Sequence, residues 1–342
     1  MSETENGSGW RGKARRVAGL VMGGLGWGLL VLPVSWAFGA LWFDFPWAEH
    51  SAPAAWLFLI GVLVVVLRVR PFWLAKGLVV LAVLVVAVWW LTLQPRQFRD
   101  WKPGVMLPAK AVVEGDEVTL YLVRNFDYRT EEDFVAKFEL RKLSLSHLEG
   151  VDLFVNYWGS ELMAHPIVSF DFGEQGRVCF SIETRMEKGE SYSAIGGLYR
   201  RFEMFLVVAE ERDVIRLRTN YRKGEDVYLY RLRKQDSRAL FLDYVAQVNE
   251  LAEKPRWYNA VTNNCTTAIL NQTRAGRLMR RDWRVLVNGY MDRLLYERGL
   301  IDRSLPFDEL KKLAHVNERA RAADQDADFS EKIRAGVPGF GG

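Results

Sequence analysis

Residues 72–93 read FWLAKGLVVLAVLVVAVWWLTL, a run in which Lys76 is the only charged side chain. A bilayer core about 30 Å thick needs about 20 apolar residues in one helix, so the run predicts a membrane-spanning helix. Lys76 lies near its start, from where a long side chain can reach the membrane interface. After this run the chain becomes rich in charged residues, which indicates that the membrane part ends here.

Two further apolar runs precede it. Residues 17–43 hold no charged side chain, and residues 54–69 hold only Arg68, near the end. We therefore predict three transmembrane helices within residues 17–93, with the first one retained because it is too long for a signal peptide. Tryptophans lie towards the ends of the runs, as in an interfacial aromatic belt: Trp42, Trp47, Trp56, Trp73, Trp89 and Trp90.

The charges that flank these runs predict the orientation. Basic residues precede the first helix and occupy the connection between the second and third, whereas the loop 44–53 contains no Lys or Arg. The positive-inside rule then places residues 1–16 in the cytoplasm and everything after the third helix in the periplasm of a bacterial inner membrane. No ionisable residue lies mid-span, so transport and proton relay have no support.

The rest of the chain predicts one α+β domain over residues 109–315. Residues 94–108, with three prolines, are expected to be a linker, and residues 316–342 a polar tail that begins as a short helix and ends loosely. Strand patterns occur at 117–124, 151–155, 166–172, 177–184, 214–218 and 227–232. The turn at Gly173–Gly176 between two of them predicts a β-hairpin. We expect a helix at 237–253, with Asp236 or Ser237 as its N-cap. A second helix is expected to begin near Asn264, and a third covers 283–298 and ends before Gly299.

Several classes of function can be set aside. A net charge of +4 over 342 residues does not indicate a nucleic-acid partner. The sequence lacks HExxH, CxxC, a phosphate-binding loop and GxSxG, so no metal or other cofactor is expected. Two cysteines, Cys179 and Cys265, are too few for a disulfide scaffold, although one bridge between them stays open.

Cys265 is the candidate nucleophile. It lies in YNAVTNNCTTAI, residues 258–269, directly after residues that cap helices. In the first turn of a helix, free N–H groups and the helix dipole favour a thiolate over a thiol. The alternative is a small buried apolar residue, and this is the interpretation we give to Cys179, which follows Val178 in a strand pattern.

His165, at the start of the strand 166–172, is the candidate base among four histidines. Glu183 is the candidate third group that orients the imidazole, with a solvent-exposed pair to Arg185 as the equally favoured alternative. The backbone N–H of Cys265 is a natural oxyanion donor. Asn259 supports it, and Tyr258 and Asn264 are weaker candidates, Asn264 being equally suited to cap the helix.

The segment 124–299 resembles the Lnb N-terminal periplasmic domain family. The similar blocks are RNFDY (124–128), VDLFVNYWG (151–159), AHPIVSF (164–170), FSIETR (180–185), IRLRT (215–219) and YNAVTNNCTT (258–267). The resemblance implies a circularly permuted papain-like fold, an antiparallel sheet plus helices in which His precedes Cys. One characterised member type is a lipoprotein transacylase, in which Cys265 would accept the acyl chain and His165 would act as base. In papain-like enzymes an amide upstream of the nucleophile occupies a place like that of Asn259.

Three functions therefore remain open. The first is cysteine-dependent acyl transfer or hydrolysis beside the lipid bilayer, with a lipoprotein or phospholipid as substrate. The second is a cell-wall peptide endopeptidase or amidase that uses the same residues. The third is a non-catalytic envelope binding module that keeps the fold.

Overall fold

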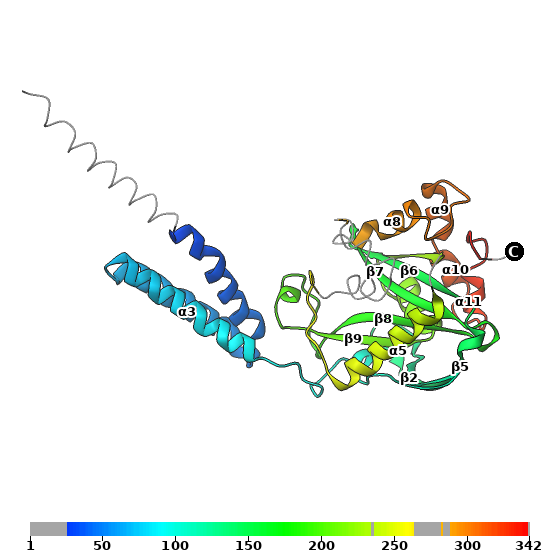
Figure 1. The fold of residues 1–342 in the computed structure, drawn as a ribbon, viewed down its shortest axis with the longest axis horizontal. Helices are drawn as coiled ribbons and strands as arrows, with labels where there is room; N and C mark the ends of the chain where they lie inside the picture. Colours follow the sequence, from blue (N-terminus) through cyan, green and yellow to red (C-terminus); the bar gives the residue numbers. More distant parts are fainter. Residues whose placement is uncertain (1–25, 234–235, 263–281, 283–287, 341–342) are drawn as a thin grey trace, which may run out of the picture. The chain divides into compact units, whose positions relative to one another are not determined.

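The computed structural model describes residues 26–233, 236–262, 282 and 288–340 (Figure 1). The chain forms two compact units. The first comprises Met1–Gln94 together with Tyr199–Arg201, and the second comprises Pro95–Leu198 and Phe202–Gly342.

The described part of the first unit contains three helices that are long and apolar enough to cross a membrane: Gly26–Asp44, α2 (Ala48–Arg68) and α3 (Phe72–Thr92). These confirm the prediction of three long apolar helices. Most of their large side chains are exposed, for example Leu84 at 54% and Leu91 at 61%, as expected of surfaces that lipid covers.

Tyr199–Arg201 belong to the helical unit through the side chain of Arg200. Its guanidinium donates to the carbonyl oxygens of Trp90 and Leu93 at the end of α3, each at 2.8 Å. The backbone N–H of Arg200 donates to Asp44, which also accepts from the indole of Trp90. Arg200 thus satisfies carbonyl groups that a helix leaves unpaired at its C-terminus.

The second unit is built on an eight-stranded sheet in the order β1-β2-β9-β8-β7-β6-β10, with β5 paired to β2. Neighbouring strands are antiparallel, except that β2 meets β9 in parallel at Arg124 and Ala209. The strands are β1 (Lys110–Glu114), β2 (Glu117–Arg124), β5 (Phe138–Ser144), β6 (Gly150–Trp158), β7 (Ser160–Asp171), β8 (Arg177–Arg185), β9 (Glu203–Ala209) and β10 (Glu225–Arg231). A separate two-stranded sheet joins β3 (Asp127–Tyr128) to β4 (Phe134–Val135).

Both faces of the large sheet are buried. Alternate residues such as Leu153, Val168 and Phe180 pack with α5 (Ser237–Glu253), which lies across one face (Figure 1). The residues between them, such as Phe154 and Ile167, form a second core on the other face. There they pack against α4 (Glu211–Arg216), α10 (Asn317–Ala322) and α11 (Phe329–Lys332). A period of two along each strand produces these two sets.

Several local predictions are confirmed. The hairpin between β7 and β8 turns through Gly173 and Gly176, which both have positive φ. Helix α5 begins at Ser237, and the side chain of Asp236 accepts a hydrogen bond from the N–H of Ala239 at 3.0 Å. The expected helix near Asn264 lies outside the described residues. Of the helix expected at 283–298 the structure describes α8 (Met291–Glu297), followed by Gly299 at φ +65°.

The predicted strand at 214–218 is wrong. This segment is the end of α4 and a π-helix, Leu217–Tyr221. Alternation of apolar and basic residues suggested a strand with one solvated face, but both basic side chains are buried in ion pairs. Arg216 contacts Asp127 and Asp324, and Arg218 contacts Glu183.

The C-terminal segment is not a loose end, contrary to our expectation. Val316, Ala320, Phe329 and Ile333 are at most 1% exposed and complete the second core. Arg334 is also buried, and its guanidinium contacts Asp152 at 2.7 Å and Glu211 at 2.6 Å. The polar composition of the segment therefore reflects buried ion pairs as well as surface charge.

Residues 95–108, expected to be a linker, pack on the second unit. The indole of Trp101 is 2% exposed and lies 4.4 Å from the guanidinium of Arg185. The described part of the second unit also contains the short helices α8 and α9 (Phe307–Ala314).

We predict that Arg334→Ala lowers the free energy of unfolding by about 3–5 kcal/mol, because it leaves Glu211 buried without its ion-pair partner and Asp152 with Arg231 as its remaining one. Denaturant unfolding of the full chain in detergent measures this loss. Lys332→Ala is the matched control, since its ion pairs to Asp326 and Asp328 are half-exposed and contribute little to stability. Equal losses in the two variants would contradict the prediction.

Candidate active site

Polar residues replace the apolar ones where the second face of the sheet extends beyond its core. On β7, His165 lies on the same face of the sheet as Ile167, two residues later. On β8, Ser181 and Glu183 lie on the same face as Cys179. Asn156 of β6 is the cross-strand partner of His165. Because alternate residues of paired strands share a face, these side chains meet at one place.

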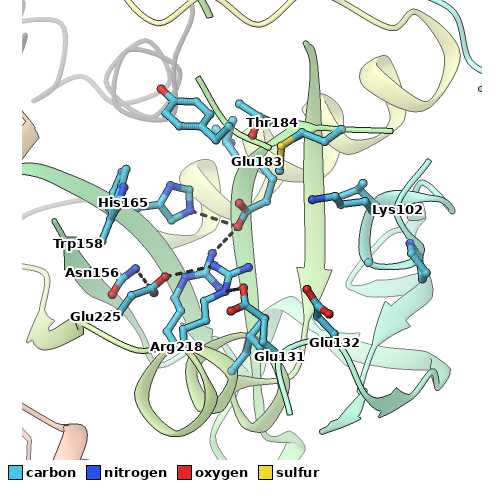
Figure 2. Close-up of a pocket in the computed structure, with 18 of the residues that line it drawn as sticks. Lys102, Glu131, Glu132, Asn156, Trp158, His165, Glu183, Thr184, Arg218 and Glu225 are labelled. Atoms are coloured by element: carbon cyan, nitrogen blue, oxygen red, sulfur yellow. Dashed lines mark hydrogen bonds and ion pairs between the residues drawn. The ribbon is translucent and has the colours of Figure 1, made fainter. Parts of the chain in front are cut away.

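His165, Ser181, Glu183 and Arg218 form a continuous network, of which Figure 2 shows His165, Glu183 and Arg218. His165 Nε2 lies 2.8 Å from Ser181 Oγ and 3.3 Å from Glu183 Oε1. The same carboxylate oxygen accepts hydrogen bonds from Ser181 Oγ and from Arg218 Nη2, both at 2.6 Å. The structure therefore brings His165 and Glu183, both selected from the sequence, into direct contact.

Glu183 is held as a carboxylate. Burial by itself would raise its pKa, but the charges of His165 and Arg218 and the hydrogen bonds from His165 and Ser181 outweigh that effect. The pKa of Glu183 consequently lies well below its ordinary value.

The alternative partner, Arg185, points elsewhere. Its guanidinium donates to the backbone carbonyls of Val105 and Met106 and to the side chain of Gln97. Glu183 is therefore not the solvent-exposed partner of Arg185 that the sequence allowed as an alternative.

A pocket of about 720 Å³ opens beside the network, and its lining has two chemical characters. The apolar part includes Trp158, Leu162, Met163, Ile182, Met186 and Tyr192. The charged part includes Lys102, Glu131, Glu132, Arg222 and Glu225 (Figure 2). The volume of this pocket is typical of small-molecule sites.

Two elements hold Arg218 in place. The π-helix Leu217–Tyr221 carries it, and its Nη1 donates to the carbonyl of Val214 one turn earlier at 2.9 Å. Within α4, Asp213 is buried and accepts from Arg124 at 2.8–3.1 Å and from the N–H of Phe126. Local π-helical geometry is frequent at functional sites.

The remaining predicted site residues are placed as follows. Tyr258 is buried and lines the pocket. Asn259 is partly buried, and its Oδ1 accepts from the N–H groups of Val261 and Thr262 at 3.0 and 2.9 Å, so its carboxamide builds a turn. Cys265 and Asn264 lie outside the described residues.

Cys179 is a free thiol, fully buried in the second core. Burial raises the pKa of Cys179 well above its ordinary value, so the thiolate that a nucleophile requires is strongly disfavoured. Among the other described histidines, His315 contacts Asp226 at 2.9 Å and does not line the pocket.

Ser181 and Arg218 were not among the site residues predicted from the sequence. Ser181 could have been found, because it precedes Glu183 by two residues and so shares its strand face. Arg218 could not, because its segment was assigned to a strand with a solvated polar face.

We predict a pH signature for Glu183. Because its folded-state pKa lies below the ordinary value of 4.5, the stabilisation by this carboxylate is complete above pH 4.5 and is lost as the pH falls below it. The thermal stability of wild type should exceed that of Glu183→Gln at pH 5 and above. That margin should shrink in more acidic buffers. A margin that stays constant to low pH would contradict this.

Comparison with known proteins gives one match. The model of the Lnb N-terminal periplasmic domain matches residues 134–289, a range that begins at β4, includes the whole network and confirms the resemblance drawn from the sequence. No curated protein and no solved structure matches the chain. With its three apolar helices, the chain is a membrane protein that carries a periplasmic domain, while the papain-like fold stays a prediction.

Proposed function

From the match of residues 134–289 to the Lnb N-terminal periplasmic domain, we propose that this protein is a membrane-anchored thiol acyltransferase or hydrolase. Its substrate is a lipid or lipoprotein in the periplasm. The supporting observation is the imidazole of His165, which Ser181 and Glu183 hold at the wall of a pocket. An oriented imidazole is the base that a thiol nucleophile requires, and Cys265 supplies the thiol.

The proposed reaction has two steps. In the first, His165 takes the proton of the Cys265 thiol, and the sulfur attacks the ester carbonyl carbon. The C–O bond then breaks, the alcohol leaves with the proton from His165, and a thioester remains on Cys265. In the second step, an amine or water gives its proton to His165 and attacks the thioester, which releases an amide or a carboxylic acid and restores the thiol.

The apolar part of the pocket favours a lipid over a cell-wall peptide. Each methylene buried there contributes about 0.8 kcal/mol, so an acyl chain gains more from this wall than a polar peptide does. Tethering to a membrane also raises the effective concentration of lipid substrates. Activity on cell-wall peptide, as endopeptidase or amidase, is the alternative outcome of the assays below.

We propose the orientation that the flanking charges indicate. Residues 1–16 lie in the cytoplasm, three helices cross the inner membrane, and the second unit lies in the periplasm. The periplasmic character of the matched family supports this arrangement.

The first test compares three variants in the full chain. Cys265→Ala and His165→Ala should each lower acyl transfer at least about 100-fold, because each removes a group that acts in the reaction. Cys179→Ala is the matched control and should retain activity, since this thiol is buried in the core. A mass-shift assay on lipoproteins and a digest of cell-wall peptide measure the two substrate classes.

A loss in Cys179→Ala as complete as that in Cys265→Ala would contradict the mechanism. Retained activity in Cys265→Ala would also overturn it. Alkylation of Cys265 by iodoacetamide adds an independent measure, because a nucleophilic thiolate should titrate below the pKa of about 8.5 of a free thiol.

The second test concerns the apolar wall. Leu162 and Met163 are 50% and 42% exposed, so Leu162→Glu and Met163→Glu should leave the fold intact. Each should raise the KM for long-chain substrates, roughly tenfold for a few methylenes displaced from the wall. Leu140→Glu on β5, 53% exposed and remote from the pocket lining, is the control. An unchanged KM in both pocket variants would argue against acyl-chain binding.

A further inference from the structure

We propose that Ser181 and Arg218 are positioning residues, which fix His165 with its proton on Nε2 and leave Nδ1 as the basic nitrogen. Neither residue carries a role from the sequence or from the family match. The tautomer follows from the described contacts alone, whereas its use by a nucleophile rests on the proposed function.

Glu183 is the fixed end of the network. Its Oε1 accepts a hydrogen bond from Arg218 Nη2 at 2.6 Å, an ion pair in which only the guanidinium can donate. Arg218 is 3% exposed and is anchored through Nη1 to the carbonyl of Val214. Glu183 is therefore a fixed, ionised acceptor with no proton of its own to give.

The hydroxyl of Ser181 comes next. It lies 2.6 Å from the same oxygen of Glu183, and because a carboxylate only accepts, the single hydroxyl proton must point at Glu183. The side of Ser181 Oγ that faces His165 then presents lone pairs. Ser181 can act towards the imidazole only as an acceptor.

The tautomer of His165 follows. Its Nε2 lies 2.8 Å from Ser181 Oγ and 3.3 Å from Glu183 Oε1, and both atoms are acceptors. Nε2 must therefore carry a proton in the neutral ring, which leaves the lone pair on Nδ1. A thiol that uses His165 as its base must approach the Nδ1 edge of the ring.

Arg218 and Ser181 contribute differently. Arg218 keeps the carboxylate charged and stationary, and without it a buried Glu183 would bind a proton more readily. Ser181 presents an acceptor to the ring, because its hydroxyl proton points at Glu183 and its oxygen is the closer contact of Nε2. Removal of either should therefore redistribute the imidazole proton without removing the imidazole.

The test is ¹⁵N NMR of the full chain in detergent micelles, labelled at the histidine ring nitrogens. His165→Gln identifies the signals of His165 among the four histidines. At a pH where the ring is neutral, wild type should show a pyridine-type shift for Nδ1 and a pyrrole-type shift for Nε2. The opposite pattern would overturn the proposal, and this result needs no variant of the network to fold.

Two variants test the individual roles. Ser181→Ala and Arg218→Gln should each move both shifts towards the average of the two tautomers. Ser169→Ala is the matched control, because this buried serine on the same sheet donates to Glu211 and lies outside the network. Unchanged His165 shifts in a folded Ser181→Ala would exclude the relay through the hydroxyl.

A kinetic measurement separates this inference from the proposed function. Iodoacetamide alkylation of Cys265 at neutral pH should slow roughly tenfold in Ser181→Ala, the effect of one charge-assisted hydrogen bond. An unreactive Cys265 in wild type together with the expected tautomer would defeat the proposed function alone. A reactive Cys265 with the proton on Nδ1 would defeat this inference alone.

Discussion

A charge buried in a protein must be paired, and this constraint organises the second unit. Its segment 211–218 carries Glu211, Asp213, Arg216 and Arg218, all nearly or fully buried. Each reaches a different part of the chain: Arg334 at the C-terminus, Arg124 at the end of β2, Asp324 before α11, and Glu183 on β8. Moving the segment would leave several charges without partners, at a cost of several kcal/mol for each.

The candidate site depends on the same constraint. Arg218 is in reach of Glu183 because α4 is held by Asp213, whose carboxylate is saturated by Arg124, the N–H of Phe126 and the hydroxyl of Tyr128. At β2 a bulge with Leu122 at φ +61° shifts the register before Val123. Arg124 lies directly after this bulge, so the irregular end of β2 serves to place the partner of Asp213. The pairs that stabilise the fold thereby also orient the imidazole.

Sequence patterns predicted the parts of the structure that local rules govern. The apolar helices, the glycine turn between β7 and β8 and the cap of α5 by Asp236 each follow from residues within a few positions of one another. Glu183 and His165 were selected for similar reasons, since both lie on predicted neighbouring strands. The predictions for the segment 214–218 and for the C-terminal segment were wrong because local patterns treat charged residues as solvated. Buried Arg334 donates a hydrogen bond to Asp152, which is 182 residues away in the sequence. A local sequence pattern cannot indicate such a distant partner.

The network around His165 does not by itself favour acyl transfer to an amine over hydrolysis by water in the proposed reaction. Glu183, Ser181 and His165 would activate an amine or a water molecule equally well, because the imidazole base acts on whichever nucleophile is adjacent to it. Selectivity must therefore come from the pocket, where the edge of the Trp158 ring faces His165 with centroids 6.4 Å apart. An acyl chain lying along the apolar lining would displace water from beside the imidazole, whereas a short polar substrate would leave it there. Under the proposed function, one arrangement of residues would serve both reactions, and the length of the bound acyl chain would set the balance between them.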